Sequence, residues 1–264
     1  MVGYADLRDA CRQLNLAGKP LIVHAALRKF GGIQGGPGAL IRALRDSFGG
    51  FLMPAFTYKT MVTPGVGPPN NGITYGNGRD LNKMAQSFHP AMPPDPLMGA
   101  LSLQLLHEEG VLRTSHPILS FAGVDVDGIL LTQTLFDPLA PIGALADQGG
   151  WALLINVDHS ANTSIHYGEK LAGRRQFVRW AVTGGRIVEC PAYPGDSTGF
   201  NAIEPYLLPH TRRADLENGA FLQAVPLKRL LEITTELIKR DPLALLCQRE
   251  DCEMCNAVKN AAGY

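Results

Sequence analysis

Residues 151–172 constrain the fold of this chain more than any other stretch. The stretch opens with an apolar run, Trp151–Ile155, of the length and character typical of a buried strand. The polar residues that follow include three with the short side chains that commonly begin helices: Asp158, Ser160 and Asn162. The pattern therefore predicts a strand that leads into a capped helix.

A helix that begins near Thr163 would carry Thr163, His166 and Glu169 at three-residue steps. At about 100° per residue these positions share roughly a third of the helix surface, just beyond a strand end where open α/β sheets bind ligands. The helix dipole disfavours imidazolium in the first turn, so His166 suits a general base. Glu169 could fix the tautomer of His166 or bind a cationic substrate. Spacing alone fits a capped surface helix equally well.

Composition narrows the class of protein. The 264 residues, 45% of them hydrophobic, suit one large domain or two small ones. Lys plus Arg and Asp plus Glu both number 24, a balance that favours neither nucleic acid nor an anionic membrane as partner. The N-terminus lacks the apolar segment of a signal peptide, and no apolar run approaches the ~20 residues of a membrane span. We expect a cytoplasmic protein.

The five cysteines are odd in number, which in an intracellular chain indicates free thiols. The tail spacing Cys247-x4-Cys252-x2-Cys255 faintly resembles a metal clip. Zinc usually takes four ligands, and Cys190 would have to be the fourth. We expect reduced, packed cysteines and no metal.

Alternating strand and helix patterns indicate an α/β fold. The pattern predicts strands near 21–27 and 50–56, and helices near 4–16, 37–48, 97–107, 200–207 and 225–240. Gly184-Gly185 predicts an antiparallel hairpin in the C-terminal half. Residues of about 57–96 are rich in Pro and Gly, which is typical of a long functional loop. We predict one domain, 1–264, with a mixed central sheet, flanking helices, the long Pro/Gly-rich insert and the hairpin.

The first predicted strand is followed by a glycine-rich loop, residues 31–36, and then by a helix. Such an arrangement can cradle an anion at the helix N-terminus. Glycines that serve only the turn explain the loop equally well.

Four blocks of residues occur in an order that is characteristic of one family. The first is His24-Ala25-Ala26-Leu27 with Gly31, Gly35 and Gly36, and the second is Met53-Pro54-Ala55-Phe56-Thr57. The third runs from Arg113-Thr114-Ser115-His116-Pro117 to Ser120-Phe121-Ala122, and the fourth from Gly149-Gly150 to Asn162-Thr163-Ser164-Ile165-His166 and Glu169. Over almost its whole length the chain resembles the aminoglycoside 3-N-acetyltransferase family.

The resemblance implies acetyl transfer from acetyl-CoA, as co-substrate, to an amino group of an aminoglycoside or related small amine. By position, His166 resembles the general base of the family and Glu169 its partner. Thr163 resembles the hydroxyl that hydrogen-bonds the thioester oxygen. A ternary complex with direct attack needs no protein nucleophile and no metal. We expect a monomer or a homodimer.

The resemblance also suggests binding residues. Those expected for CoA are Leu27, Arg28, Gly31, Gly35, Gly36, Ser120 and Phe121. Those expected for the amine are Tyr58, Asp158, Glu169 and Asp196.

The chain departs from the family where Ala25-Ala26 replaces two serines, which removes two hydroxyls. Two alternatives follow: a family member that binds CoA without catalysis, and one that acetylates a non-antibiotic amine. A metal-dependent hydrolase that uses His24, His116 or His166 is a third, but no HxH, HExxH or paired CxxC spacing supports it.

Overall fold

The three apolar runs near residues 21, 51 and 151 form parallel strands at the centre of the molecule. In the computed structural model, which describes residues 1–263, β1 (Leu21–Ala25) lies between β2 (Phe51–Pro54) and β6 (Trp151–Ile155). β1 is parallel to both neighbours. Nearly every residue of these strands is buried, because helices cover both faces of the sheet, and this explains why the runs are continuously apolar.

Antiparallel strands extend the sheet on both sides. β5 (Phe121–Val124) and β4 (Leu112–Arg113) follow β2, whereas β10 (Phe221–Pro226) and β9 (Arg212–Asp215) follow β6. The resulting seven-stranded order is β4-β5-β2-β1-β6-β10-β9. The prediction of a mixed central sheet is confirmed.

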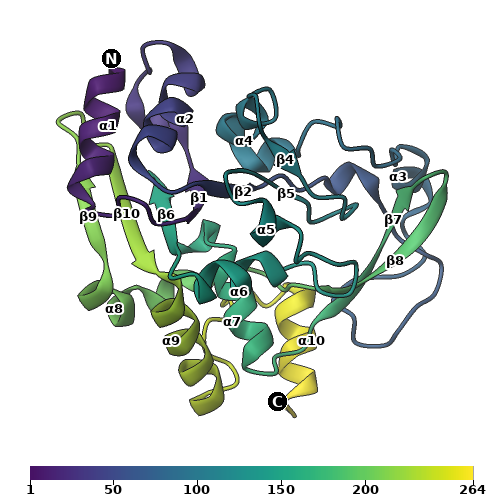
Figure 1. Ribbon diagram of the computed structural model, residues 1–264. Coiled ribbons are helices and arrows are strands. Elements are labelled where there is room, and N and C mark those ends of the chain that lie inside the picture. Colours follow the sequence, from purple (N-terminus) through teal and green to yellow (C-terminus); the bar gives the residue numbers. More distant parts are fainter. Residues whose placement is uncertain (264) are drawn as a thin grey trace.

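Residues that alternate along β1 face two separate hydrophobic cores. Leu21 and Val23 belong to the core covered by α1 (Tyr4–Gln13), α2 (Gly36–Ser47) and α4 (Gly99–Leu105). Ile22 belongs to the other, which is covered by α5 (Asp127–Leu130), α6 (Ala140–Asp147), α7 (Ser164–Leu171) and α9 (Leu227–Arg240). The fold therefore has three layers, with the sheet in the middle (Figure 1).

The predicted hairpin consists of β7 (Phe177–Thr183) and β8 (Arg186–Tyr193), and Gly184 and Gly185 both have positive φ in its turn. The hairpin forms a second sheet with β3 (Met61–Val62), which comes from the long insert. The insert also contains the short helix α3 (Arg79–Lys83). It is therefore packed structure and not a simple linker.

Two further helices, α8 (Glu204–Leu207) and α10 (Glu253–Ala261), lie in the C-terminal part. The range 200–207 was predicted as one helix, but it begins with a 3-10 turn, Phe200–Ile203. The helix predicted over 225–240 starts at Leu227 because β10 runs directly into it. None of the helices described within residues 1–263 is both long enough and apolar enough to cross a membrane.

Close packing of α7 against α9 gives a testable prediction. A Cβ atom added at Gly168 would lie 2.6 Å from the Cβ of the buried Thr234. Alanine normally favours a helix by about 1 kcal/mol over glycine, but overpacking costs about 1–3 kcal/mol. We expect Gly168→Ala to lower the free energy of unfolding. Gly128→Ala in α5 is the control, because nothing lies within 4 Å of its added Cβ. If urea denaturation gives the same change in the free energy of unfolding for both variants, this packing argument is contradicted.

Candidate active site

A cavity of about 890 Å³ opens at the carboxyl ends of β1, β2 and β6. The chain from Val23 to Arg28 forms one wall, and Met53, Pro54 and Phe56 follow β2. The remaining walls include Tyr58, Met98, Thr163, His166, the turn from Tyr193 to Ser197, and Met254. The cavity thus lies where the sequence placed a ligand site, at the end of the central strands.

His166 is the only cavity residue whose ring is held by a buried carboxylate, among the residues that the structure describes. Its Nδ1 lies 2.7 Å from Oε2 of Glu169, one helical turn along α7. A carboxylate is only an acceptor, so Nδ1 carries the proton and, in the neutral ring, Nε2 carries the lone pair. Because the ring lines the cavity, Nε2 is the nitrogen available to a ligand. This geometry suits a general base.

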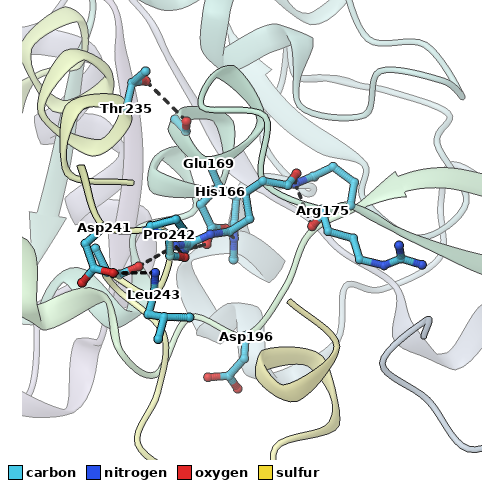
Figure 2. A network of polar contacts seen from close by, with 12 residues as sticks. His166, Glu169, Arg175, Asp196, Thr235, Asp241, Pro242 and Leu243 are labelled. Carbon is cyan, nitrogen blue, oxygen red and sulfur yellow. Dashed lines mark hydrogen bonds and ion pairs between the residues drawn. The ribbon is translucent and has the colours of Figure 1, made fainter. Parts of the chain in front are cut away.

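Glu169 is itself fixed by an ion pair. Its Oε1 accepts a hydrogen bond of 2.7 Å from Arg174, and both side chains are 2% exposed. Arg174 also donates to the carbonyl oxygens of Pro242 and Ala244, at 2.8 and 2.6 Å. Figure 2 shows His166 and Glu169 beside the turn that contains Pro242. The sequence predicted the His166–Glu169 pair from its spacing, but no local pattern indicated Arg174.

The polar residues before α7 cap it in two steps. An oxygen of Asp158 accepts the N–H of Ser160, and this begins a 3-10 turn at His159. Oδ1 of Asn162 then accepts the N–H of Ser164, the first residue of α7. Thr163 is the N-cap residue and lines the cavity near His166. The prediction of a strand followed by a capped helix is confirmed.

The residues expected for CoA separate into two groups. Leu27 and Arg28 line the cavity. The other five do not: Gly31 and Gly35 have positive φ before α2, Gly36 has positive φ as its first residue, and Ser120 and Phe121 are fully buried. Oγ of Ser120 donates to the carbonyl of Ala55 at 2.7 Å, so Ser120 supports the cavity wall from behind.

The residues expected for the amine also separate. Tyr58 and Asp196 line the cavity. Asp158 caps the turn before α7, and Glu169 lies behind His166, bonded on both oxygens. Asp196 is the one acidic side chain among the described residues that line the cavity.

His24, a residue of the first family block that the sequence also offers as a metal ligand, lines the cavity. Its Nε2 is buried without a hydrogen-bond partner in the described part of the chain. Burial, reinforced by the nearby His159, lowers the pKa of His24 to about 3. His24 therefore presents a neutral ring. Tyr193 and Met254 on the same cavity come from distant segments, and no local signal in the sequence connects them to it.

Three thiols gather beside the cavity. Cys247, Cys252 and Cys255 lie with Asp196 so that one ligand atom from each is within 4.8 Å of the others. Cys190, which a four-cysteine site would have required, lies in β8 and outside this group. The fourth member of the group is the carboxylate of Asp196.

His116 holds the loop that carries Leu119 to the cavity. Its Nδ1 accepts the N–H groups of Ile118 and Leu119, at 3.2 and 2.9 Å. Burial lowers the pKa of His116 from its ordinary 6.5 to about 4. Protonation would remove both hydrogen bonds, so the neutral ring has a structural role in this loop.

The pKa of His116 predicts a pH dependence of stability. Below pH 6.5 the unfolded chain binds a proton that the folded chain excludes, so stability falls as the pH drops from about 6.5 to about 4. At 1.36 kcal/mol per pKa unit the loss is about 3 kcal/mol. His116→Asn keeps an acceptor oxygen and does not titrate, so we expect a smaller decline. Urea midpoints at pH 7 and 4.5 measure it; an unchanged decline would exclude His116 as the cause.

Comparisons with known proteins identify the family of the chain. A sequence model described as aminoglycoside 3-N-acetyltransferase matches residues 22–239. Aminoglycoside N(3)-acetyltransferase III of Salmonella sp is 27% identical over 181 residues, which are 63% of this chain and 59% of the relative. Aminoglycoside N(3)-acetyltransferase VIII of Streptomyces fradiae is 29% identical over 192 residues, 65% of this chain and 63% of that protein. The chain thus matches about three fifths of the length of these relatives.

Solved structures share the fold. The aminoglycoside acetyltransferase AAC(3)-IVa apoenzyme superimposes with a TM-score of 0.78 and 22% identity, over 98% of this chain and 97% of that one. The YokD protein of Bacillus subtilis gives a TM-score of 0.75 and 18% identity, over 91% of this chain and 100% of that one. Since the family model spans most of the sequence and the fold agrees throughout, the chain belongs to the aminoglycoside 3-N-acetyltransferase family.

Proposed function

We propose that this chain is one acetyltransferase domain that transfers the acetyl group of acetyl-CoA to an amino group of an aminoglycoside or related small amine. The observation that carries the proposal is the buried chain from Arg174 through Glu169 to His166, which ends at the cavity. Family membership supports the reaction class. The names of relatives, and a structure of AAC(3)-IVa in complex with a gentamicin, support the acceptor class.

The residues of the cavity divide the work of direct transfer. Nε2 of His166 accepts the proton that the amine loses as its nitrogen bonds to the acetyl carbon. The hydroxyl of Thr163 donates to the carbonyl oxygen as that oxygen gains charge. His166 then returns the proton to the sulfur as the carbon–sulfur bond breaks. No cysteine lines the cavity within the described residues, which agrees with direct attack.

One cationic side chain of the cavity supports an anionic co-substrate. Arg28 is the one Lys or Arg side chain among the described lining residues, and it can meet a phosphate. Asp196, on the turn after β8, is the acidic side chain that lines the cavity among the described residues. Aminoglycosides are polycations that favour several acidic groups, so a small amine with fewer charges is an acceptor of equal standing.

Turnover with acetyl-CoA tests the proposal. Thiol release is measured with gentamicin, apramycin, sisomicin, spermidine and a simple monoamine. We expect release with at least one of them. Acetyl-CoA binding with no turnover on any acceptor would favour the second candidate, a family member that binds CoA without catalysis. Ala25 and Ala26 on the cavity wall support that candidate because they carry no hydroxyls.

A further inference from the structure

We propose that Cys247, Cys252, Cys255 and Asp196 bind one zinc ion that fixes the C-terminal segment to the cavity wall. The four residues come from two distant parts of the chain. Asp196 lies on the turn after β8, and the three cysteines lie around the start of α10. This inference does not depend on the proposed function.

The local structure explains how the thiols meet. Cys252 is the N-cap of α10, and Cys255 follows in its first turn, so the two point to the same side of the helix. Cys247 approaches from the segment before α10, where Gly199 packs against the backbone of Leu246. An added Cβ at Gly199 would lie 2.5 Å from that backbone, so the turn bearing Asp196 and the cysteine segment are in direct contact.

The donor set matches zinc. Three thiolates and one carboxylate complete a tetrahedron, with zinc–sulfur bonds of about 2.3 Å and therefore sulfur–sulfur separations of roughly 3.8 Å. The ligand atoms already lie within 4.8 Å of one another, so only a small contraction is needed. All three thiols are free and buried, at 3%, 7% and 1% exposure. Iron–sulfur clusters ordinarily take four cysteines, and calcium and magnesium take oxygen ligands.

Neighbouring groups prepare the site. Arg249 donates to Oδ2 of Asp196 at 2.9 Å. Its positive charge would offset part of the net negative charge of three thiolates and a carboxylate around a divalent ion. The N–H of Thr198 donates to Oδ1 of Asp196 at 2.9 Å and orients the carboxylate. Partners of this kind around ligands tune metal sites.

A disulfide is the competing use of these cysteines. It would join two of the three sulfurs and leave the third unpaired, and it would give Asp196 no part. A disulfide would therefore not explain why a carboxylate lies against three thiols. Figure 2 shows Asp196 on its own turn near the C-terminal helix, apart from His166 and Glu169. The proposed ion is therefore structural: it holds Asp196 and Met254, which both line the cavity, in one wall.

Metal analysis of the full chain without a histidine tag tests the proposal. We expect one zinc ion per chain by inductively coupled plasma mass spectrometry. Cobalt(II) added to chelator-treated protein should give the thiolate charge-transfer and tetrahedral d–d absorption bands. Zinc removal should lower the thermal unfolding midpoint, because the ion binds only the folded chain.

Variants test whether the zinc is bound by these four residues and not by another cysteine. Cys252→Ser and Cys255→Ser should lose the zinc, and Asp196→Asn should weaken its binding at least about tenfold. Cys190→Ala is the matched control: it removes a buried cysteine outside the group and should retain one zinc per chain. Wild-type protein that holds no zinc and gives no cobalt bands, or that shows a disulfide between any two of these cysteines, would overturn the proposal. The cobalt spectrum of the wild type decides the question even if the variants do not fold.

Discussion

We expect the His166→Gln variant to acetylate its acceptor about 10²- to 10⁴-fold more slowly than the wild type, because that is the usual contribution of a general base. Glutamine keeps a polar group beside Glu169 but cannot take a proton at neutral pH. The loss should shrink as the pH rises, since more of the acceptor amine is then already neutral. Steady-state kcat between pH 6 and 9, measured by thiol release, gives the profile.

His89→Gln is the matched control for this substitution, because His89 is exposed and lies outside the cavity. It should leave kcat unchanged. If His166→Gln retains wild-type kcat and an unaltered pH profile, His166 is not the base. Retained acetyl-CoA affinity in the variant would show that the cavity is intact.

The second large effect concerns stability. We expect Arg174→Met to lower the free energy of unfolding by about 3–5 kcal/mol, because it leaves the carboxylate of Glu169 buried without its partner. The carbonyl oxygens of Pro242 and Ala244 lose their donor in the same step. Denaturation in guanidinium chloride, followed by circular dichroism, measures the change.

Arg175→Met is the neighbouring control. Arg175 is half-buried and donates one hydrogen bond, of 3.0 Å, to the carbonyl of Pro69, so its loss should cost only about 1 kcal/mol. Adding Glu169→Gln to Arg174→Met should recover part of the stability, because no unpaired charge then remains. Equal losses for the two arginine variants would mean that the buried pair is not what stabilises this region.

Continuous apolar runs made the centre of the fold predictable. Strands such as β1 and β6 are covered on both faces, and such burial leaves a signal within one short segment. β9 left none, because it lies at the edge of the sheet and buries only Ala214 among its charged residues. β3 was missed because two residues of the insert pair with the hairpin, and the pairing appears only in three dimensions.

In the candidate site, too, contacts within one helix were predictable from the sequence and contacts between distant segments were not. His166 and Glu169 lie one turn apart on a helix, so their spacing predicted the contact that the structure shows. Arg174 enters from beyond the end of α7, and Asp196 meets the cysteines across a long stretch of chain. Contacts of this kind depend on how distant segments fold together, and neither residue lies in a pattern that would identify its partner.

The parallel pairing of β1 with β6 has a consequence during synthesis. Their register places Ile22 beside Ala152, so a growing chain exposes one edge of the buried strand β1 until the ribosome has passed residue 155. Nascent chains lengthen by about 5–20 residues per second, and an apolar edge open for that time invites pairing with other chains. The need for chaperones should therefore be greatest before β6 is synthesised, when the central sheet cannot yet close.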